Sequence, residues 1–486
     1  MLPTYYDTFF IDGVWARPKG TDVIHVVSPA TEEIIGSVPS GTSADMDSAV
    51  LAARRAFDEG PWPRMSLNER TEILLKIAAY LEEKGPDLAR LISSEMGSPL
   101  KRLAAAAPMP ALLIKKTLDM AKVFPFVESR QGMVGDALIV REPVGVVGGI
   151  TPWNGPLHLL MMKFAPALVA GCTFVSKPSP EAPLDAYVLA AACEAAGLPR
   201  GVFNLVPGGR ELGEHLVTHP GVDKISFTGS TTAGRRIAEL CGRDMRRFTL
   251  ELGGKSAAVA LSDADPKKVA SHAVARGLAF NSGQACAALT RVIVPRARQQ
   301  EFVDAMVAEI DKLVTGDPSD PQVDVGPMVA ERQRDRVESY IAAGLSEGAR
   351  LVRGGGRPDG LERGWFVEPT LFSDATNDMK IAREEIFGPV GVIIPYDGGD
   401  EEAIALANDT PYGLAGAVFT EDASRGIAAA RRIRAGTMGC NTFFIDPLLP
   451  FGGFKSSGVG RENGPEGIAI FTEIKTLQGV ALQELE

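Results

Sequence analysis

The stretch Val144-Gly-Val-Val-Gly-Gly-Ile150 decides the fold of this 486-residue chain. A short apolar run that stops close to a proline, here Pro152, is typical of a strand buried inside a sheet. Two further runs of this kind follow, Cys172-Thr-Phe-Val-Ser-Lys177 and Val202-Phe-Asn-Leu-Val206. Strand starts at 144, 172 and 202 match the roughly 30 residues of a strand–helix–strand unit. The sequence therefore predicts a parallel sheet in this region.

Helical patterns fill the intervals between these strands. Residues 158–170 carry apolar side chains on one side, and a second helix is expected over 184–196, closed by Gly197. A further strand at 224–228 leads into a helix at 231–240. This alternation predicts a sheet that is covered by helices on both faces.

The same alternation starts again after Gly254. A strand at 257–261, a helix at 266–280 and a strand at 291–294 indicate a second α/β unit that runs to about residue 455. Amphipathic helices over 44–60 and 67–84 precede the first unit. The predicted fold class is therefore α/β, with two doubly wound domains.

Two segments do not fit either unit. Residues 123–143 alternate apolar and polar side chains, which predicts a protruding β-hairpin, and residues 474–482 predict one more strand. Neither segment has enough apolar surface for a core of its own. We therefore expect both to pair with another segment, and a second subunit is the favoured partner.

Composition excludes several classes of protein. The formal net charge is -11 and no Lys/Arg-rich run occurs, which disfavours binding to nucleic acid or to an anionic membrane. No signal peptide or stretch long enough to span a bilayer is recognisable. The five cysteines are scattered singly, which is typical of free thiols in the cytoplasm and not of a disulfide framework or a zinc site.

Cys286 is the first candidate for chemistry. It lies in Asn281-Ser-Gly-Gln-Ala-Cys-Ala287, where small neighbours leave a thiol approachable by substrate. A lone cysteine is more often a small buried apolar residue. Gly283 weakens that alternative, because a cysteine used only for packing needs no glycine beside it.

Two polar side chains could assist such a thiol. Glu251 follows a strand and precedes two glycines, so a carboxylate there could act as a general base, although a strand-end carboxylate is usually solvated. Asn154, in Pro152-Trp-Asn-Gly-Pro156, is in most such turns only a turn residue. Its amide could instead stabilise a developing oxyanion, since ligands of open α/β sheets bind beyond the carboxyl ends of strands.

An anion site is predicted at a neighbouring strand end. Phe227-Thr-Gly-Ser-Thr231 opens a helix whose N-terminus suits a pyrophosphate, and Lys177 could direct an ammonium at ribose or phosphate. The glycine fingerprint G-x-G-x-x-G of dinucleotide-binding folds is missing at this junction.

Together these motifs are far more specific than any one of them. Their order along the chain resembles that of the aldehyde dehydrogenase superfamily, and the resemblance spans essentially the whole sequence. Seven motifs carry it: Pro152-Trp-Asn-Gly-Pro156, Lys177-Pro-Ser, Phe227-Thr-Gly-Ser230, Glu251-Leu-Gly-Gly-Lys255, Gly283-Gln-Ala-Cys286, Glu384-Glu-Ile-Phe-Gly-Pro389 and Pro450-Phe-Gly-Gly-Phe-Lys-Ser-Ser-Gly458.

The resemblance implies a catalytic role for three residues. Cys286 matches the nucleophile of the family, Glu251 the general base and Asn154 the side-chain member of the oxyanion hole. The implied reaction oxidises an aldehyde to a carboxylic acid through a thiohemiacetal and a thioester on the cysteine.

The resemblance also implies a division of labour along the chain. Residues 1–122 and 144–253 would form a Rossmann-like cofactor-binding domain, 254–455 the catalytic domain, and 123–143 with 470–486 an oligomerisation element of a homodimer or homotetramer. Six residues match positions that line the cofactor: Trp153, Lys177, Gly229, Ser230, Glu385 and Phe387.

The chain departs from the family pattern at the adenosine ribose. Relatives commonly carry Glu where this chain has Pro180, and that carboxylate favours NAD over NADP. NAD is the expected cofactor because most relatives use it, and NADP is the alternative. Glu181 is adjacent, but on an extended segment its side chain should point elsewhere.

The expected aldehyde is apolar, aliphatic or aromatic. Gly155 stands where relatives often have an aromatic side chain, which should widen the substrate channel. Four apolar residues match positions that line this channel: Leu159, Met162, Phe280 and Phe451. A small anionic semialdehyde would instead require an arginine.

Four other functions were weighed. A semialdehyde dehydrogenase or a CoA-acylating dehydrogenase could share this fold, but the latter needs no base at Glu251. A non-enzymatic binding protein should have lost at least one of the three implied catalytic residues. A metal enzyme lacks ligands, because only His215 and His219 have helical i, i+4 spacing; no metal is therefore expected.

Overall fold

The computed structural model describes residues 2–479, and its first sheet contains the predicted parallel strands. The eight strands run in the order β19-β11-β10-β7-β8-β9-β1-β2, with β11 to β9 parallel and the strands at both ends antiparallel. Their bounds are β1 Phe9–Ile11, β2 Val14–Ala16, β7 Val146–Ile150, β8 Thr173–Lys177, β9 Phe203–Leu205, β10 Lys224–Thr228, β11 Arg247–Glu251 and β19 Gly458–Val459.

Both faces of this sheet are buried, as the continuous apolar runs predicted. Neighbouring residues enter opposite cores, because strand side chains alternate between the two faces: Val147 and Phe174 lie in one apolar cluster, Val146 and Val175 in the other. The helices of this half are α1 Ser43–Asp58, α2 Leu67–Glu83, α3 Gly85–Met96, α4 Leu100–Ala106, α5 Met109–Ala121, α6 Pro156–Ala170, α7 Leu184–Ala195, α8 Arg210–Thr218, α9 Thr231–Arg243 and α16 Gly464–Ala469, with the short turn η1 Trp62–Arg64.

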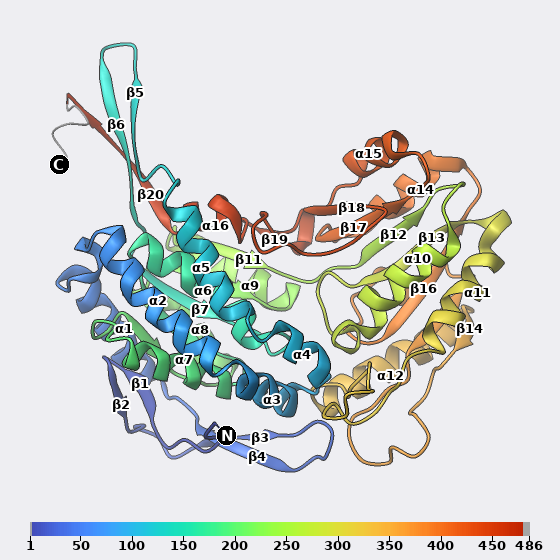
Figure 1. The fold of residues 1–486 in the computed structure, drawn as a ribbon, viewed down its shortest axis with the longest axis horizontal. Coiled ribbons are helices and arrows are strands. Elements are labelled where there is room, and N and C mark those ends of the chain that lie inside the picture. The colour runs from blue at the N-terminus through green and yellow to red at the C-terminus, as the bar shows by residue number, and fades with distance from the viewer. Residues whose placement is uncertain (1, 480–486) are drawn as a thin grey trace.

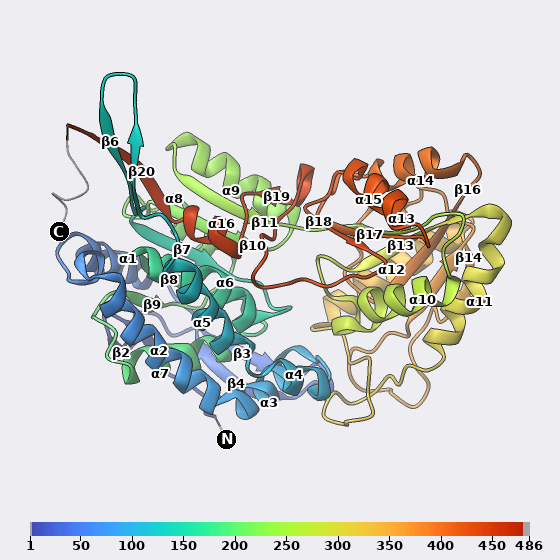
Figure 2. The same ribbon diagram turned by 45° about the horizontal axis from the view of Figure 1, so that its top comes forward.

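The second sheet has seven strands in the order β14-β15-β16-β13-β12-β17-β18, of which only β14 is antiparallel. The strands are β12 Ser256–Ala260, β13 Leu289–Pro295, β14 Arg350–Arg353, β15 Thr370–Ser373, β16 Val390–Tyr396, β17 Ala415–Phe419 and β18 Thr437–Cys440. The helices are α10 Pro266–Ala273, α11 Gln299–Ile310, α12 Glu331–Ser346, α13 Lys380–Arg383, α14 Gly399–Asn408 and α15 Ala423–Arg432, with the short turns η4 Arg296–Arg298 and η5 Lys455–Ser457. Figures 1 and 2 show the two sheets in separate halves, so the α/β prediction with two wound sheets is confirmed.

The predicted protruding hairpin is present, but its partner is in the same chain. Strands β5 Val127–Gln131 and β6 Asp136–Pro143 form the hairpin, and β20 Thr472–Gln478 pairs with β6 along its whole length. The two segments therefore pair with each other, and β6 needs no strand from a second subunit; among residues 2–479 the outer edges of β5 and β20 have no strand partner. The three-stranded sheet stands away from the body in Figure 1. Residues 480–482 of the predicted strand lie outside the described residues.

The predicted helix over 266–280 is interrupted. Regular α10 ends at Ala273, a wider π-helical turn, η2 Val274–Ala279, follows, and the chain then bends through η3 Phe280–Gly283. Gly277 fits tightly against the Leu289 carbonyl, where any Cβ would collide. This packing and two left-handed residues, Asn281 and Ser282, turn the chain toward the segment that carries Cys286.

A hairpin of β3 Val23–Val27 and β4 Ile34–Pro39 completes the fold. This hairpin was not predicted from the sequence, and neither were β1, β2, α3 and α5. Between residues 2 and 479, no helix is long and apolar enough to cross a membrane.

Candidate active site

The parallel strands bring four sequence-predicted segments to one edge of the first sheet. The register pairs Ile150 with Lys177 and Thr228 with Glu251, so the carboxyl ends of β7, β8, β10 and β11 lie side by side. The turn with Asn154, the Lys177 loop, the Gly229-Ser230 turn and the loop after Glu251 all leave from this edge.

The loop before Cys286 is held by amide hydrogen bonds. Asn281 and Ser282 adopt left-handed backbone conformations, with φ of 53° and 55°. The Asn281 side chain donates to the carbonyl oxygens of Gln284 (3.1 Å) and Asn154 (2.9 Å). Gln284 in turn accepts from the backbone of Val329 through Oε1 (3.0 Å). Such a network fixes the segment that presents Cys286 to the first sheet.

Asn154 directs its amide at the same loop. Its Nδ2 donates to the Gln284 carbonyl at 3.1 Å, two residues before Cys286. The side chain is partly exposed, and Gly155 beside it opens helix α6 with a proline at its first position. Asn154 is therefore a donor in contact with the cysteine loop, whereas most asparagines in such turns bond only to their own turn.

Cys286 differs from the other cysteines in its surroundings. Cys172, Cys193 and Cys241 are buried and Cys440 is exposed on the surface, while Cys286 is partly exposed between the two halves of the chain. Burial of its site raises the pKa of the Cys286 thiol to about 12, and the nearby carboxylates of Glu385 and Glu251 raise it further, whereas two backbone N–H groups oppose them. The sulfur is thus a protonated thiol at neutral pH in this arrangement.

Glu251 is a buried carboxylate without hydrogen bonds. It ends β11, is 3% exposed, and neither carboxylate oxygen has a hydrogen-bond partner among residues 2–479. Burial raises its pKa well above the usual value and the charge of Glu462 adds to this, while Lys163 and Arg461 act in the opposite direction. A carboxyl group with a raised pKa and free oxygens suits proton transfer to or from a nearby water.

A buried ion pair stands behind Glu251. Lys163, in the middle of α6, donates to Thr228 Oγ1 at 2.6 Å and forms a salt bridge with Glu462. Both charged side chains are essentially inaccessible to water. After burial, which has the largest effect on the pKa of Glu251, the charges of this pair adjust it in opposite directions: Glu462 raises it and Lys163 lowers it.

Glu385 and Phe387 approach the site from the second half of the chain. Glu385 accepts the Gly254 N–H at 2.9 Å, and any Cβ on Gly253 would crowd its carboxylate. Burial raises the pKa of Glu385 to about 7. The Phe387 ring meets Trp153 edge-to-face, with ring centroids 5.3 Å apart.

The predicted phosphate-binding residues have partners of their own. Lys177 donates to the carbonyls of Pro178 and Gly208, and burial lowers its pKa to about 8. The Gly229 N–H donates to the Glu251 carbonyl (3.0 Å), so it is not free for a ligand. Ser230 caps α9 by accepting from the backbone N–H of Ala233 (3.2 Å).

The segment after Pro180 is a turn, contrary to the expected extended conformation. Glu181 lies in this turn, where its carboxylate accepts a hydrogen bond from the Ser179 hydroxyl and forms an ion pair with Arg332. Its carboxylate is therefore engaged with Arg332 on α12 of the second half.

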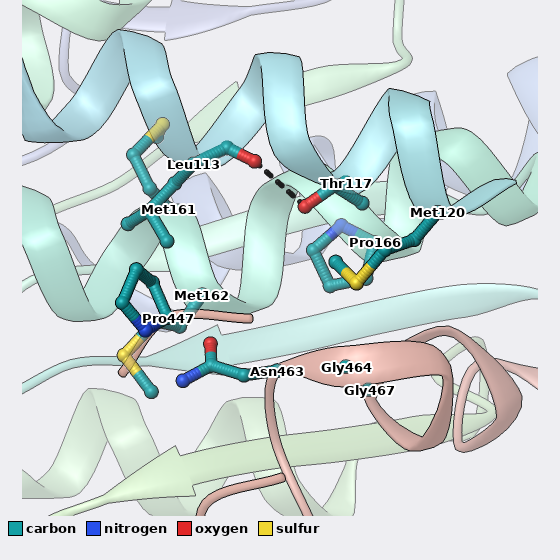
Figure 3. A pocket seen from close by; sticks show the side chains of 10 residues that line it. All are labelled: Leu113, Thr117, Met120, Met161, Met162, Pro166, Pro447, Asn463, Gly464 and Gly467. Carbon is teal, nitrogen blue, oxygen red and sulfur yellow. Dashed lines mark hydrogen bonds between the residues drawn. The ribbon is translucent and has the colours of Figure 1, made fainter. Parts of the chain in front are cut away.

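One pocket lies between α5, α6 and the start of α16. Figure 3 shows the lining side chains, among them Met162 of α6 facing the 447–467 segment. The hollow holds about 250 Å³, part of it open to solvent. Apolar side chains and glycines predominate, with Thr117 and Asn463 as the polar groups; the lining comprises Leu113, Thr117, Met120, Met161, Met162, Pro166, Pro447, Asn463, Gly464 and Gly467.

The other predicted channel residues lie outside this pocket's lining. Gly155 and Leu159 adjoin at the start of α6, where a Cβ on Gly155 would be 3.5 Å from the Leu159 side chain. The Arg102 guanidinium stacks on the Phe280 ring, with its central carbon 3.9 Å from the ring centroid. Phe451 is buried and exchanges two backbone hydrogen bonds of 2.7 Å with Glu462.

The two histidines with helical spacing link helix α8 to helix α1. His215 and His219 both reach Asp47 of α1, at 2.6 and 3.5 Å. In the part of the chain that the structure describes, no group of three or more side chains is placed to hold a metal ion.

Sequence comparison gives this arrangement a family. The pattern of the aldehyde dehydrogenase family matches residues 15–477. The chain belongs to this family. It is 46% identical over 472 residues to geranial dehydrogenase of Castellaniella defragrans, covering 96% of this chain and 98% of that protein. It is 45% identical to the 3-succinoylsemialdehyde-pyridine dehydrogenase of a Pseudomonas species, with 98% of each chain covered.

Solved structures agree with the assignment to the aldehyde dehydrogenases. A Mycobacterium tuberculosis aldehyde dehydrogenase in complex with NAD+ superimposes with a TM-score of 0.94 at 46% identity, covering 99% of this chain and all of that one. A mutant of aldehyde dehydrogenase C from Pseudomonas syringae, in complex with NAD+ and octanal, gives a TM-score of 0.93 at 42% identity, with 98% and 97% covered. The chain is therefore an enzyme that oxidises aldehydes to acids.

Two site residues of this aldehyde dehydrogenase escaped the sequence analysis, Lys163 and Glu462. One signal was available for Lys163, since it is the only Lys, Arg, Asp or Glu in the apolar helix α6. A lone charge on a helix that is buried nearly all round must find a partner. No signal in the sequence identified Glu462, 299 positions away, as that partner.

Proposed function

We propose that this chain oxidises apolar aldehydes with NAD through a thioester on Cys286. The observation that supports this most directly is a juxtaposition. Cys286, from the second half of the chain, lies close enough to Glu251, at the end of β11 in the first half, for their charges to interact, and the Asn154 amide faces the same loop. A nucleophile, an acid–base group and an oxyanion donor thus converge from distant parts of the sequence.

Acylation begins at the sulfur. Cys286 is partly exposed and gives up its proton to solvent water, and the thiolate attacks the aldehyde carbon to form a thiohemiacetal oxyanion. The Asn154 Nδ2 and the backbone N–H of Cys286 are the donors available to this oxygen. Bound NAD accepts the hydride when the oxyanion collapses, and an acyl group then remains on Cys286 as a thioester.

Deacylation falls to Glu251. Its unpaired oxygens accept a proton from water as that water attacks the thioester, which releases the carboxylic acid and regenerates the thiol. The raised pKa of Glu251 makes it a stronger base than an ordinary carboxylate once it is ionised.

The residues at the sheet edge fit a dinucleotide. Gly253 has no side chain and so leaves room for the Glu385 carboxylate. One carboxylate oxygen of Glu385 accepts from the Gly254 N–H, and the carboxylate can also accept from the hydroxyls of a ribose diol. The N-terminus of α9 at Ser230 and the Lys177 ammonium suit the phosphates. We propose 1–122 with 144–253 as the cofactor-binding domain, 254–455 as the catalytic domain, and 123–143 with 470–486 as an oligomerisation element.

A test of the cofactor compares NAD with NADP at one fixed aldehyde concentration. Pro180 has no carboxylate that would repel the 2′-phosphate of NADP. Glu181 lies in the same turn, but its carboxylate forms an ion pair with Arg332. Because relatives are solved with NAD+, we expect the higher kcat/KM with NAD, and activity with NADP as well. Reduction followed at 340 nm measures both. An enzyme that used NADP alone would contradict the cofactor assignment.

The substrate test uses aldehydes of different polarity. The pocket between α5 and α6 is lined mainly by apolar side chains and contains no charged residue, and relatives are named for geranial or bound to octanal. We therefore expect kcat/KM for octanal or decanal to exceed that for succinate semialdehyde by at least about 10-fold, the value of one or two buried methylenes. A preference for the semialdehyde would contradict the proposal. Acid formation without CoA excludes a CoA-acylating reaction.

The charges around Glu251 predict opposite pH shifts for two substitutions. Glu462 raises and Lys163 lowers the pKa of Glu251. Since the base acts when ionised, Glu462→Gln should move the acidic limb of the kcat profile to lower pH, and Lys163→Met should move it to higher pH. If the acidic limb moved in the same direction in both variants, or did not move in either folded variant, the Lys163–Glu462 pair would not control the pKa of Glu251.

The three-stranded sheet supports assembly into a homodimer or homotetramer. Val127 of β5 and Ile474 of β20 are exposed apolar side chains on its free outer strands. We place the enzyme in the cytoplasm, because free single cysteines suit a reducing compartment. Sedimentation of the full chain measures the assembly.

A further inference from the structure

Lys255 ends the Glu251-Leu-Gly-Gly-Lys255 motif, and the reaction described above gives it no role. Its side chain is 2% exposed, and its ammonium has no hydrogen-bond partner among residues 2–479. The hydroxyl of the next residue, Ser256, is also buried and unpartnered within the described chain. Buried polar groups are normally hydrogen-bonded, because a buried donor or acceptor without a hydrogen bond costs free energy.

Both unpartnered donors border the same hollow. It lies behind the Cys286 loop, at the amino ends of β12 and β17, between the two loops that precede β17 and β18. Gly254, one residue before Lys255, packs against the Cys286 carbonyl so closely that any Cβ would collide with it, and neither Gly254 nor Cys286 lines the hollow. The lining comprises Lys255, Ser256, Ala257, Arg291, Ala407, Thr410, Tyr412, Gly413, Leu414, Ala415, Gly416, Ile433, Arg434 and Ala435.

The charged groups that line this hollow are all cationic. Arg291 and Arg434 line it together with Lys255, and Lys455 is near enough to interact with both arginines. The buried Arg291 guanidinium uses its nitrogens on the carbonyls of Lys255, Leu406 and Ala407 and on the side-chain oxygen of Asn377. It therefore contributes positive charge to the hollow while four of its five N–H donors are occupied.

The nearest carboxylates have partners outside the hollow. Asp409 accepts from Asn377 and pairs with Arg383, Glu384 accepts from the Tyr340 hydroxyl, and Glu385 accepts from Gly254. None of the three lines the hollow. Its positive charge is thus left without an anion in direct contact with Lys255 or Ser256.

We propose that Lys255 and Ser256 form a binding site for a small monovalent anion, a halide or a short carboxylate. The ammonium and the hydroxyl would both donate to it, which satisfies two buried donors at once. The buried Arg291 guanidinium would add attraction at short range. Neither Cys286 nor Glu251 nor Asn154 lines the hollow, so this anion is distinct from an aldehyde or its acid at Cys286.

The site should bind anions more weakly as the pH rises. Burial lowers the pKa of Lys255 to about 7, Arg291 and Arg336 add to this effect, and Glu385 and Glu384 oppose it. The ammonium form binds the anion, so the affinity falls as the pH passes through 7. For a group with this pKa, the ionised fraction at pH 8 is about one tenth of that at pH 6. We therefore expect about 10-fold weaker binding at pH 8.

The direct test uses wild-type enzyme in bromide. Crystals soaked in sodium bromide should show an anomalous peak within hydrogen-bond reach of Lys255 Nζ and Ser256 Oγ. In solution, bromide and acetate are titrated separately against the melting temperature, at constant ionic strength with gluconate as the bulky counter-anion. A saturable rise in the melting temperature with bromide identifies a halide site, and a saturable rise with acetate identifies a carboxylate site. No saturable rise with either anion, or only ordered water in the hollow, would overturn the proposal.

Two variants tie the effect to these donors. Ser256→Ala keeps the charge and should weaken anion binding by about 10-fold or more, the usual value of one hydrogen bond to a charged group. Lys255→Met should abolish the saturable rise. Lys312→Met is the matched control, since Lys312 is an exposed lysine at the end of α11 that pairs with Glu309. Unchanged titration in a folded Ser256→Ala and in Lys255→Met would refute the assignment.

Discussion

Replacing Cys286 with serine is expected to lower kcat for aldehyde oxidation by about 1,000-fold or more. The substitution exchanges one atom in a loop that is held by Asn281 and Gln284, so the geometry should persist. The chemistry should not persist, because an unactivated hydroxyl is a far weaker nucleophile than a thiolate. Losing a nucleophile removes most of the rate acceleration of such an enzyme.

Three readouts make this result specific. Steady-state oxidation of octanal reports the loss, NAD binding by fluorescence should remain within about 3-fold of wild type, and the melting temperature should hold. Cys440→Ser is the matched control, since Cys440 is exposed on β18, and it should retain full turnover. Full turnover by the Cys286→Ser enzyme would remove the basis for the thioester mechanism.

Glu251→Gln should give the second largest effect, a fall in steady-state kcat of about 100- to 10,000-fold. Glutamine keeps the shape of the side chain but cannot accept a proton from water. It also removes a charge that raises the pKa of Cys286. The thiol should therefore ionise at least as readily as in the wild type, and formation of the acyl-enzyme should not be slowed. The expected signature is a burst of NADH equal to the enzyme concentration, followed by slow turnover.

Intact-protein mass spectrometry tests where this variant stalls. After mixing with octanal and NAD, the Glu251→Gln enzyme should carry an octanoyl group on Cys286. Glu362→Gln, at an exposed loop position, is the control and should show neither the burst nor the adduct. Loss of the burst together with the turnover would place Glu251 in acylation and contradict its assignment to deacylation.

The predicted elements that were right depend on local patterns. The runs at β7, β8 and β10 are continuous and apolar because both faces of a central parallel strand are buried, so each strand could be located from its own residues. Elements with shorter or more mixed patterns were missed, such as β1 and β2 at the edge of the sheet. Their place depends on pairing with β9, nearly 200 residues away in the chain.

By itself, the sequence determined the α/β class, the positions along the chain of strands that end at the site, and the candidates Cys286, Glu251 and Asn154. Each of these is encoded in a few consecutive residues. Only the tertiary structure decided the pairing of β20 with β6, the placement of Lys163 and Glu462 behind Glu251, and the unpartnered donors of Lys255 and Ser256. The physical reason is that partners, burial and electrostatic fields arise between segments hundreds of residues apart, where no local pattern records which groups lose their water together.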